Sequence, residues 1–166
     1  MKHVIHNVQE LQKLASEMVP KFAIHNHKSA IVVGLSGELG AGKTTFTQAV
    51  AAALGIFESV TSPTFVILKI YGLENQPFER LVHIDAYRLE SGSELASLGF
   101  DDLVRDPRNL ILIEWPERVE DVLPEERINV RFEIMNDETR EVTIDDFGLQ
   151  IADLENGRAR PLILQS

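Results

Sequence analysis

Cysteine is absent from the 166 residues of this chain. A disulfide framework and a thiolate metal site are therefore excluded, and any bound metal must take oxygen or imidazole ligands. No hydrophobic run reaches membrane-spanning length, and residues 1–10 lack the basic start and apolar stretch of a signal peptide. We therefore expect an unexported, cytoplasmic protein that does not enter a membrane.

Basic side chains are scarce, because 16 Lys and Arg residues stand against 26 Asp and Glu residues, for a formal net charge of −10. A chain with this charge repels the phosphate backbone of nucleic acids. We therefore expect any tRNA to be held by a partner protein. Repeats and low-complexity segments are also lacking, and the length suits one folded unit, so we expect a single domain over residues 1–166.

Hydrophobic spacing predicts alternating helices and strands. Residues 7–18 have helical spacing with Asn7 as the cap, residues 30–35 form an apolar run typical of a buried strand, and the alanine-rich segment 43–54 predicts a helix that ends at Gly55. A further helix is expected at 91–98. Further strands are expected at 64–71, 81–84, 110–113, 128–134 and 140–144, and residues 161–164 are expected to form a last packing strand or an ordered tail.

The order and character of these segments predict the fold class. The last two strands alternate apolar with polar residues, which is typical of half-exposed antiparallel pairs. The earlier apolar strands alternate with helices, which favours parallel pairing with both faces covered. We expect an α/β, P-loop NTPase-like fold with a mixed, mainly parallel central sheet flanked by helices and antiparallel strands toward the C-terminus.

A glycine-rich segment lies between the strand at 30–35 and the helix at 43–54. Residues 37–44 match the Walker A pattern of glycine, four residues, glycine, lysine, and serine or threonine. Glycines let backbone N–H groups converge on phosphate oxygens, and the following helix adds its free donors and positive dipole end. In this interpretation Lys43 reaches the β- and γ-phosphates, Thr44 binds magnesium and Thr45 donates to the outer phosphates. The alternative is a glycine turn at the start of an ordinary helix.

Acidic residues follow two of the predicted strands directly. Glu114 ends the apolar run 110–113 and is the candidate for the second magnesium ligand that a P-loop requires. Asp85 follows residues 81–84 in the same manner and is a candidate either for the magnesium shell or for orienting the attacking water. The alternative is that each carboxylate simply points into solvent where its strand ends, which is common.

Other polar and aromatic residues have two readings each. The segment 61–64 is either a switch that senses the γ-phosphate or a proline turn, and Arg88 meets a phosphate or forms an exposed salt bridge. Trp115 is expected to be a packing residue or an aromatic at a partner surface rather than a platform for a base. Residues 117–126 are expected to form a solvated helix and turn.

Four successive motifs together resemble the signatures of the TsaE (YjeE) family: residues 36–45, 61–65, 83–89 and 113–116. The resemblance implies a compact P-loop fold and a weak, magnesium-dependent ATPase that takes ATP and ADP. It also implies a function with the TsaD and TsaB proteins in making threonylcarbamoyladenosine in tRNA, where the ATPase supports turnover.

The same resemblance implies the roles of particular residues. Thr61 corresponds to the family's switch threonine, Arg140 to an arginine near the nucleotide, and Gln9 or Glu10 to a segment near the adenine. The catalytic residues are expected to be Lys43, Asp85 and Glu114, and the metal ligands Thr44 and Glu114. The expected nucleotide-binding residues are Gly37, Gly40, Ala41, Gly42, Lys43, Thr44, Thr45, Thr61, Asp85, Arg88 and Arg140.

Three other classes of function compete with this reading. A small-molecule kinase uses the same cradle, and Arg105 and Arg108 would then imitate the arginines of a closing lid. A switch GTPase is disfavoured, because the chain has no Asn-Lys-x-Asp string for guanine and no Asp-x-x-Gly string after the second strand. In a nucleotide-gated binding module, hydrolysis resets a protein interface, which predicts slow turnover that partners change.

Overall fold

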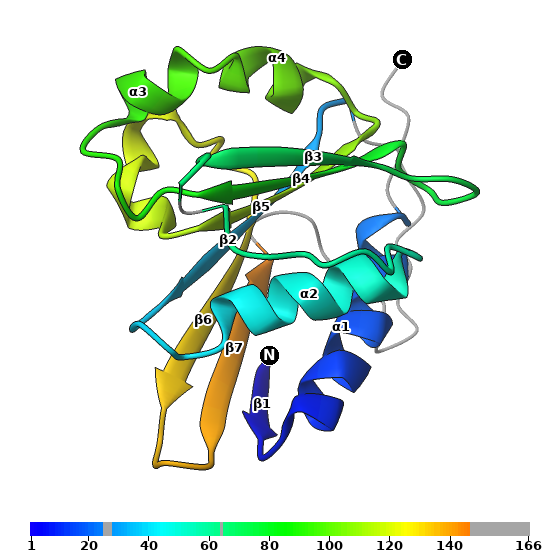
Figure 1. The fold of residues 1–166 in the computed structure, drawn as a ribbon, viewed down its shortest axis with the longest axis vertical. Coiled ribbons are helices and arrows are strands. Elements are labelled where there is room, and N and C mark those ends of the chain that lie inside the picture. Colours follow the sequence, from blue (N-terminus) through cyan, green and yellow to red (C-terminus); the bar gives the residue numbers. More distant parts are fainter. Residues whose placement is uncertain (25–27, 64, 147–166) are drawn as a thin grey trace, which may run out of the picture.

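The chain folds around one seven-stranded sheet in the order β1-β7-β6-β2-β5-β4-β3, so the predicted α/β class is confirmed (Figure 1). The computed structural model describes residues 1–24, 28–63 and 65–146. The predicted segment 161–164 lies outside these ranges. The strands and helices are β1 (Lys2–Ile5), α1 (Val8–Phe22), β2 (Ile31–Gly37), α2 (Lys43–Ala53), β3 (Leu68–Gly72), β4 (Arg80–Asp85), α3 (Gly92–Ala96), α4 (Phe100–Arg105), β5 (Asn109–Glu114), β6 (Ile128–Ile134) and β7 (Arg140–Asp146).

The four inner strands β6, β2, β5 and β4 run parallel, and the antiparallel pairs lie toward the two edges. In the register, Leu35 pairs with Glu114 and Glu114 pairs with Asp85. All three therefore lie at the carboxyl end of the parallel strands. Since β2 continues directly into the glycine-rich loop, this loop lies at the same end of the sheet as Glu114 and Asp85.

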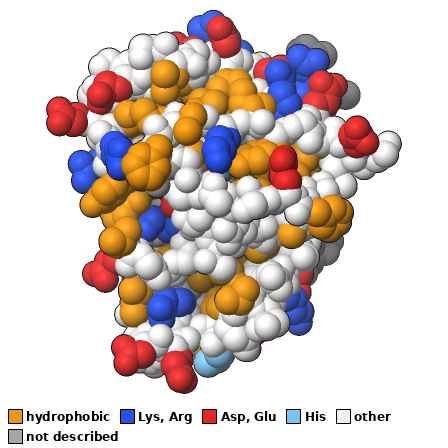
Figure 2. All heavy atoms as spheres, in the orientation of Figure 1, with side chains coloured by type: hydrophobic (Ala, Val, Ile, Leu, Met, Phe, Trp, Pro, Cys, Tyr) orange, Lys and Arg blue, Asp and Glu red, His pale blue; other side chains and the backbone are white. Residues whose placement is uncertain are grey.

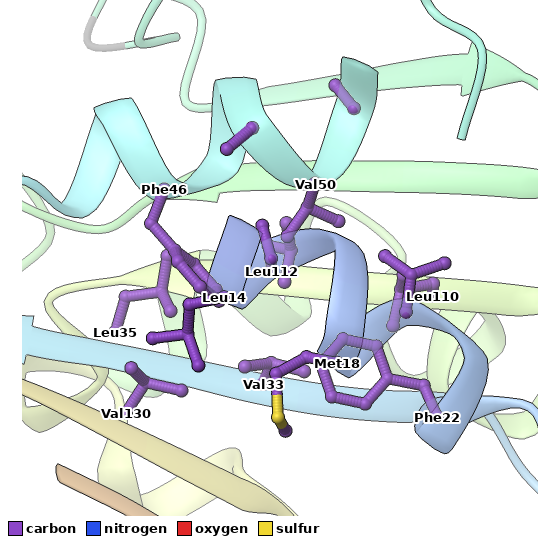
Figure 3. Close-up of a cluster of buried hydrophobic side chains, with 14 of the residues drawn as sticks. Leu14, Met18, Phe22, Val33, Leu35, Phe46, Val50, Leu110, Leu112 and Val130 are labelled. Atoms are coloured by element: carbon purple, nitrogen blue, oxygen red, sulfur yellow. The ribbon is translucent and has the colours of Figure 1, made fainter. Parts of the chain in front are cut away.

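One face of the sheet is covered by α1 and α2. The helices contribute Leu14, Met18, Phe22, Phe46 and Val50, which meet the inward side chains of β2, β5 and β6 in a single buried cluster (Figure 3). Each of these five side chains is buried almost completely, and burying one of them stabilises the fold by roughly 1.5–3 kcal/mol. This cluster holds α2, and with it the glycine-rich loop, against the sheet.

The short helices α3 and α4 lie on the opposite side of the sheet (Figure 1). Leu95 and Phe100 from these helices pack with Val82, Ile111 and Ile113 of the central strands. Among the described residues, none of the helices combines the length and the apolar character needed to cross a membrane.

Three local features differ from the sequence-based expectations. The strand predicted from residue 64 begins at Leu68, because Val66 and Ile67 donate their N–H groups to the carbonyl of Pro63 in a turn, and Ile67 has φ +69°. The segment 117–126 is not a solvated helix: it forms two 3₁₀ turns, and the intervening Val119 is fully buried. The strand β1 and the helix α4 were not predicted, because each is too short for a periodic signal.

A compact ionic network lies at the opposite end of the sheet from the glycine-rich loop. Arg108 donates from Nε to Oδ1 of Asp106 at 2.8 Å and from Nη2 to Oδ2 at 2.7 Å, while Arg80 also donates to Oδ2. Arg108 reaches Glu79 as well, at 3.2 Å. The hydrogen bonds from Arg108 hold the pKa of the Asp106 carboxyl well below its usual range.

Replacing Asp106 with asparagine should lower the free energy of unfolding at neutral pH, and this loss should shrink in acid. Because the pKa of Asp106 is lower in the folded state, its contribution is complete above the unfolded value of about 4 and disappears as the pH falls toward the folded value. Urea unfolding of wild type and Asp106→Asn at several pH values measures the difference.

The matched control is Asp102→Asn, because the Asp102 side chain is 88% exposed and lies 3.9 Å from Arg105. This change should leave the unfolding free energy nearly unaltered at every pH. A difference for Asp106→Asn that stays constant down to about pH 2.5 would contradict the assignment.

Candidate functional site

The glycine-rich loop joins the end of β2 at Gly37 to the start of α2 at Lys43. Gly37 has φ +143°, and a Cβ atom there would lie 2.5 Å from the carbonyl oxygen of Phe132 on the neighbouring strand. Only glycine therefore fits where the loop leaves the sheet. At the other end, Gly42 is the N-cap with φ +113°, and no side chain of the described residues caps it. The first N–H groups of α2 are thus available to an anion.

Lys43 is buried at the base of this loop, with 4% of its surface exposed. Its Nζ donates to the carbonyls of Gly37 at 2.6 Å and Glu38 at 2.8 Å, and it lies 4.1 Å from the centre of the Trp115 ring. Burial lowers the pKa of the Lys43 ammonium, and the negative charge of Glu114 opposes that shift. The ammonium is therefore held by backbone oxygens and an aromatic face, all within the loop and its rim.

Thr44 and Glu114 meet directly beside the loop. The Thr44 hydroxyl lies 2.9 Å from Oε1 and 3.0 Å from Oε2 of Glu114. Oε1 also lies 2.9 Å from Nε2 of His83, whose side chain is fully buried. The fold thus brings a hydroxyl from the first turn of α2 into contact with a carboxylate from the end of β5, although the two residues are 70 positions apart in the sequence.

Asp85 lies next to Glu114, because β4 and β5 are paired in register at this point. Its Oδ2 accepts a hydrogen bond from the Ser62 hydroxyl at 2.6 Å, and its Oδ1 accepts one from the backbone N–H of Tyr87 at 3.0 Å. The side chain is 5% exposed. The segment that follows α2 is thereby tied to the end of β4.

These groups line a pocket of about 330 Å³. The side chains combine oxygen and nitrogen groups at the base with apolar and aromatic groups at the rim. The lining residues are Leu39, Gly40, Gly42, Lys43, Thr44, Thr45, Ser62, Asp85, Tyr87, Glu114 and Trp115.

The donor set of this pocket fits magnesium bound together with phosphates. Magnesium in nucleotide sites is held by one or two carboxylates or hydroxyls, phosphate oxygens and water, and the convergence of Thr44 on Glu114 supplies the protein part of such a shell. Within the described ranges, no group of three or more His, Asp or Glu side chains is arranged to hold a metal by itself.

The pocket brings together seven of the residues expected from the sequence: Gly40, Gly42, Lys43, Thr44, Thr45, Asp85 and Glu114. As far as the described residues define the pocket, five other expected residues do not line it: Gly37 and Ala41 of the glycine-rich segment, and Thr61, Arg88 and Arg140. Thr61 accepts a hydrogen bond from Lys69 at 3.2 Å, and the Arg88 guanidinium lies 4.6 Å from the centre of the Phe65 ring. Arg140 donates to the carbonyl of Asn136 in the turn between β6 and β7. Their proposed contacts with a nucleotide remain predictions.

Trp115 packs against the hydrophobic cluster around Phe100 and Ile113, which agrees with the expected packing role, and it also lines the pocket, which was not predicted. Its ring faces Lys43 and lies 5.1 Å from the ring of Tyr87. Its backbone has φ +60°, which turns the chain sharply after Glu114. Leu39, Ser62 and Tyr87 were also missed as lining residues, and their positions inside the recognised motifs were the available signal.

The sheet order, the loop between β2 and α2 and the acidic ends of β4 and β5 define a P-loop NTPase-like α/β protein. The sequence model of the family described as threonylcarbamoyl adenosine biosynthesis protein TsaE matches residues 5–142. The chain belongs to this TsaE family.

Individual relatives agree with this assignment. The chain is 39% identical to the tRNA threonylcarbamoyladenosine biosynthesis protein TsaE of Bacillus subtilis over 139 residues, which cover 84% of this chain and 82% of the relative. It is 42% identical to the Streptomyces coelicolor protein of the same name over 123 residues, which cover 70% and 80% of the two chains. The crystal structure of Bacillus subtilis YdiB superposes with a TM-score of 0.72 at 30% identity, covering 95% of this chain and 92% of that one.

Replacing Gly37 with alanine should lower the free energy of unfolding by more than the unfavourable positive φ alone would. The new Cβ would meet the carbonyl oxygen of Phe132, its partner in the β2–β6 pairing, so the two strands must move apart. Gly99→Ala is the matched control, because Gly99 has φ +84° with no atom within 4 Å of the added Cβ. The control should cost about 1–2 kcal/mol in urea unfolding. Equal losses for the two variants would contradict the steric argument.

Proposed function

We propose that this protein is a magnesium-dependent ATPase that supports the formation of threonylcarbamoyladenosine in tRNA. The observation that carries the proposal is the contact of Thr44 with Glu114 beside a Walker A loop, since these two oxygen groups are the protein ligands that a nucleotide-bound magnesium ion requires. The names of the relatives supply the biological process, because they are called tRNA threonylcarbamoyladenosine biosynthesis proteins.

In the proposed reaction, water attacks the γ-phosphorus of ATP, and the products are ADP and inorganic phosphate. The N–H groups at the start of α2 and the Lys43 ammonium bind phosphate oxygens, for which Lys43 must leave the carbonyls of Gly37 and Glu38. Magnesium, held by Thr44 and Glu114, would neutralise charge on the phosphates. Asp85 lies beside Glu114 and orients the attacking water or a water of the metal shell.

The proposed partners are TsaD and TsaB, and tRNA is proposed to be reached through them. The net charge of −10 disfavours direct binding to RNA. Large hydrophobic side chains are exposed at the pocket rim and close to it, including Leu39 (78%), Phe65 (86%) and Tyr87 (43%). On the face in Figure 2, hydrophobic side chains gather in several groups, while acidic side chains lie mostly along the outline. Exposed apolar groups beside a nucleotide pocket favour turnover that depends on a protein partner.

The kinase alternative loses the residues that favoured it. Arg108 precedes β5, whereas Glu114 ends it, so Arg108 lies at the opposite end of the sheet from the pocket. Arg108 is bound to Asp106 and Glu79, and Arg105 lies near Asp102. Neither arginine is placed to close over a phosphate at the glycine-rich loop.

Nucleotide binding should change the fluorescence of Trp115, the only tryptophan of the chain. The ring faces the Lys43 ammonium at 4.1 Å in the structure, and a nucleotide would draw that ammonium toward its phosphates. Titration with ADP and magnesium should therefore give a saturable signal. Glu117→Gln is the control and should keep the signal. Because Lys43→Ala removes the group that produces the signal, its affinity is measured by isothermal titration calorimetry and should be about 10-fold weaker or more. A Lys43→Ala variant that binds like wild type would exclude the proposed role of Lys43.

Phosphate release tests the proposed activity directly. Wild type with magnesium should release phosphate slowly from ATP and more slowly from GTP, and purified TsaD and TsaB should accelerate the release from ATP. Glu114→Ala should reduce the rate by about 10²-fold, because the metal loses its carboxylate ligand. Glu117→Gln again serves as the control, since Glu117 is exposed just beyond Glu114.

Two outcomes would overturn the proposal. A rate from ATP that is the same for wild type and Glu114→Ala would exclude the metal site. Loss of ATP without phosphate release, with the phosphoryl group appearing on a small molecule from a metabolite extract, would replace the ATPase with a kinase.

A further inference from the structure

A histidine is buried in the middle of the sheet, just below the candidate metal site. His83 lies on β4, is 0% exposed, and is paired in register with Leu112 of β5 and Lys69 of β3. The preceding residue on the same face, Leu81, is an ordinary member of the hydrophobic cluster beneath α2. Burying a polar imidazole ring among these apolar side chains is costly unless the ring is hydrogen-bonded, so His83 requires an explanation other than packing.

The hydrogen bonding of His83 identifies which nitrogen carries the proton. Nε2 lies 2.9 Å from Oε1 of Glu114, and a carboxylate oxygen accepts hydrogen bonds, so Nε2–H is the donor. Within the described part of the chain, Nδ1 is buried and has no partner. The ring thus makes one directed bond, and that bond ends on Glu114.

The carboxylate of Glu114 is consequently held from two sides. Oε1 accepts from His83 and lies 2.9 Å from the Thr44 hydroxyl, which also lies 3.0 Å from Oε2. Because His83 on β4 contacts Oε1 and Thr44 on α2 contacts both oxygens, the orientation of the carboxylate relative to α2 is fixed. The Thr44 hydroxyl can donate to this carboxylate while its lone pairs point to a cation.

We propose that His83 is a positioning residue that orients the Glu114 carboxylate for the nucleotide-bound magnesium ion. The inference rests on the proposed function, because it concerns the same metal site. Histidine–carboxylate contacts behind metal ligands fix the orientation of the ligand, and their loss usually weakens metal binding 10- to 100-fold. His83 itself contacts neither metal nor substrate.

Mn²⁺ is a suitable probe, since its electron paramagnetic resonance signal measures its binding to the protein–ADP complex without any turnover. His83→Leu removes the donor and should weaken Mn²⁺ binding by about 10- to 100-fold. His83→Gln carries an amide N–H at a similar distance from the backbone and should restore Mn²⁺ affinity to within about 3-fold of wild type. Binding of ADP in the presence of EDTA should be unchanged in both variants, because His83 does not touch the phosphates.

Two further variants separate orientation from stability. Leu81→Ala lies on the same strand and face and is also fully buried, so it should lower the melting temperature but leave Mn²⁺ affinity unchanged. His83→Asn has a side chain too short to bring its amide to Glu114, and it should behave like His83→Leu even if the leucine variant folds poorly.

Each result bears on the inference. Mn²⁺ affinity that is unchanged in His83→Leu and His83→Asn would overturn it, and so would an equal loss in His83→Gln, since packing would then be the cause. A wild-type protein that binds neither ADP nor Mn²⁺ would overturn the proposed function together with the inference. Normal wild-type binding with no effect of the His83 variants would overturn the inference alone.

Discussion

The parallel register of β2, β5 and β4 determines where the chemical groups of the pocket lie. Pairing of Leu35 with Glu114 and of Glu114 with Asp85 brings the loop and two carboxylates to one edge of the sheet. A slip of one residue would turn Glu114 and Asp85 to the opposite face, toward α3 and α4. The hydrophobic cluster beneath α1 and α2 prevents this slip, because the same shift would also expose its buried leucines and valines. Packing and site geometry are thus fixed by one pairing.

The pocket compensates its buried charges from within the chain. Lys43 is satisfied by two loop carbonyls and the Trp115 ring, Glu114 by Thr44 and His83, and Asp85 receives hydrogen bonds from Ser62 and the N–H of Tyr87. Burying an unpaired charge is costly, so these internal partners are needed to keep the site formed. A ligand that replaces them meets groups already near their working positions, which reduces the ordering needed on binding.

Much of the fold was predictable, because its central strands and two long helices carry strong periodic signals and the Walker A loop has a fixed pattern. The sequence did not show what depends on contacts between distant segments. His83 is an ordinary strand residue by pattern, and only the β4–β5 pairing brings it to Glu114. Trp115 packs as expected, but its additional position in the pocket lining depends on the turn after Glu114, where its φ is +60°. Arg140 was assigned by resemblance alone, and local carbonyls of its hairpin hold its guanidinium.

The strand β1 lies at the edge of the sheet and is paired with β7, which is the last described strand of the chain. During synthesis on a ribosome, β1 therefore emerges long before β7 and has no pairing partner until the residues between them have been made. Ile5 and the apolar side of α1 remain without their final neighbours over that interval, since Val142 and Ile144 belong to the same cluster. Pairings this far apart in sequence close late and slowly. The nascent N-terminal segment thus has a long exposure to chaperones and to misassociation before the sheet is completed.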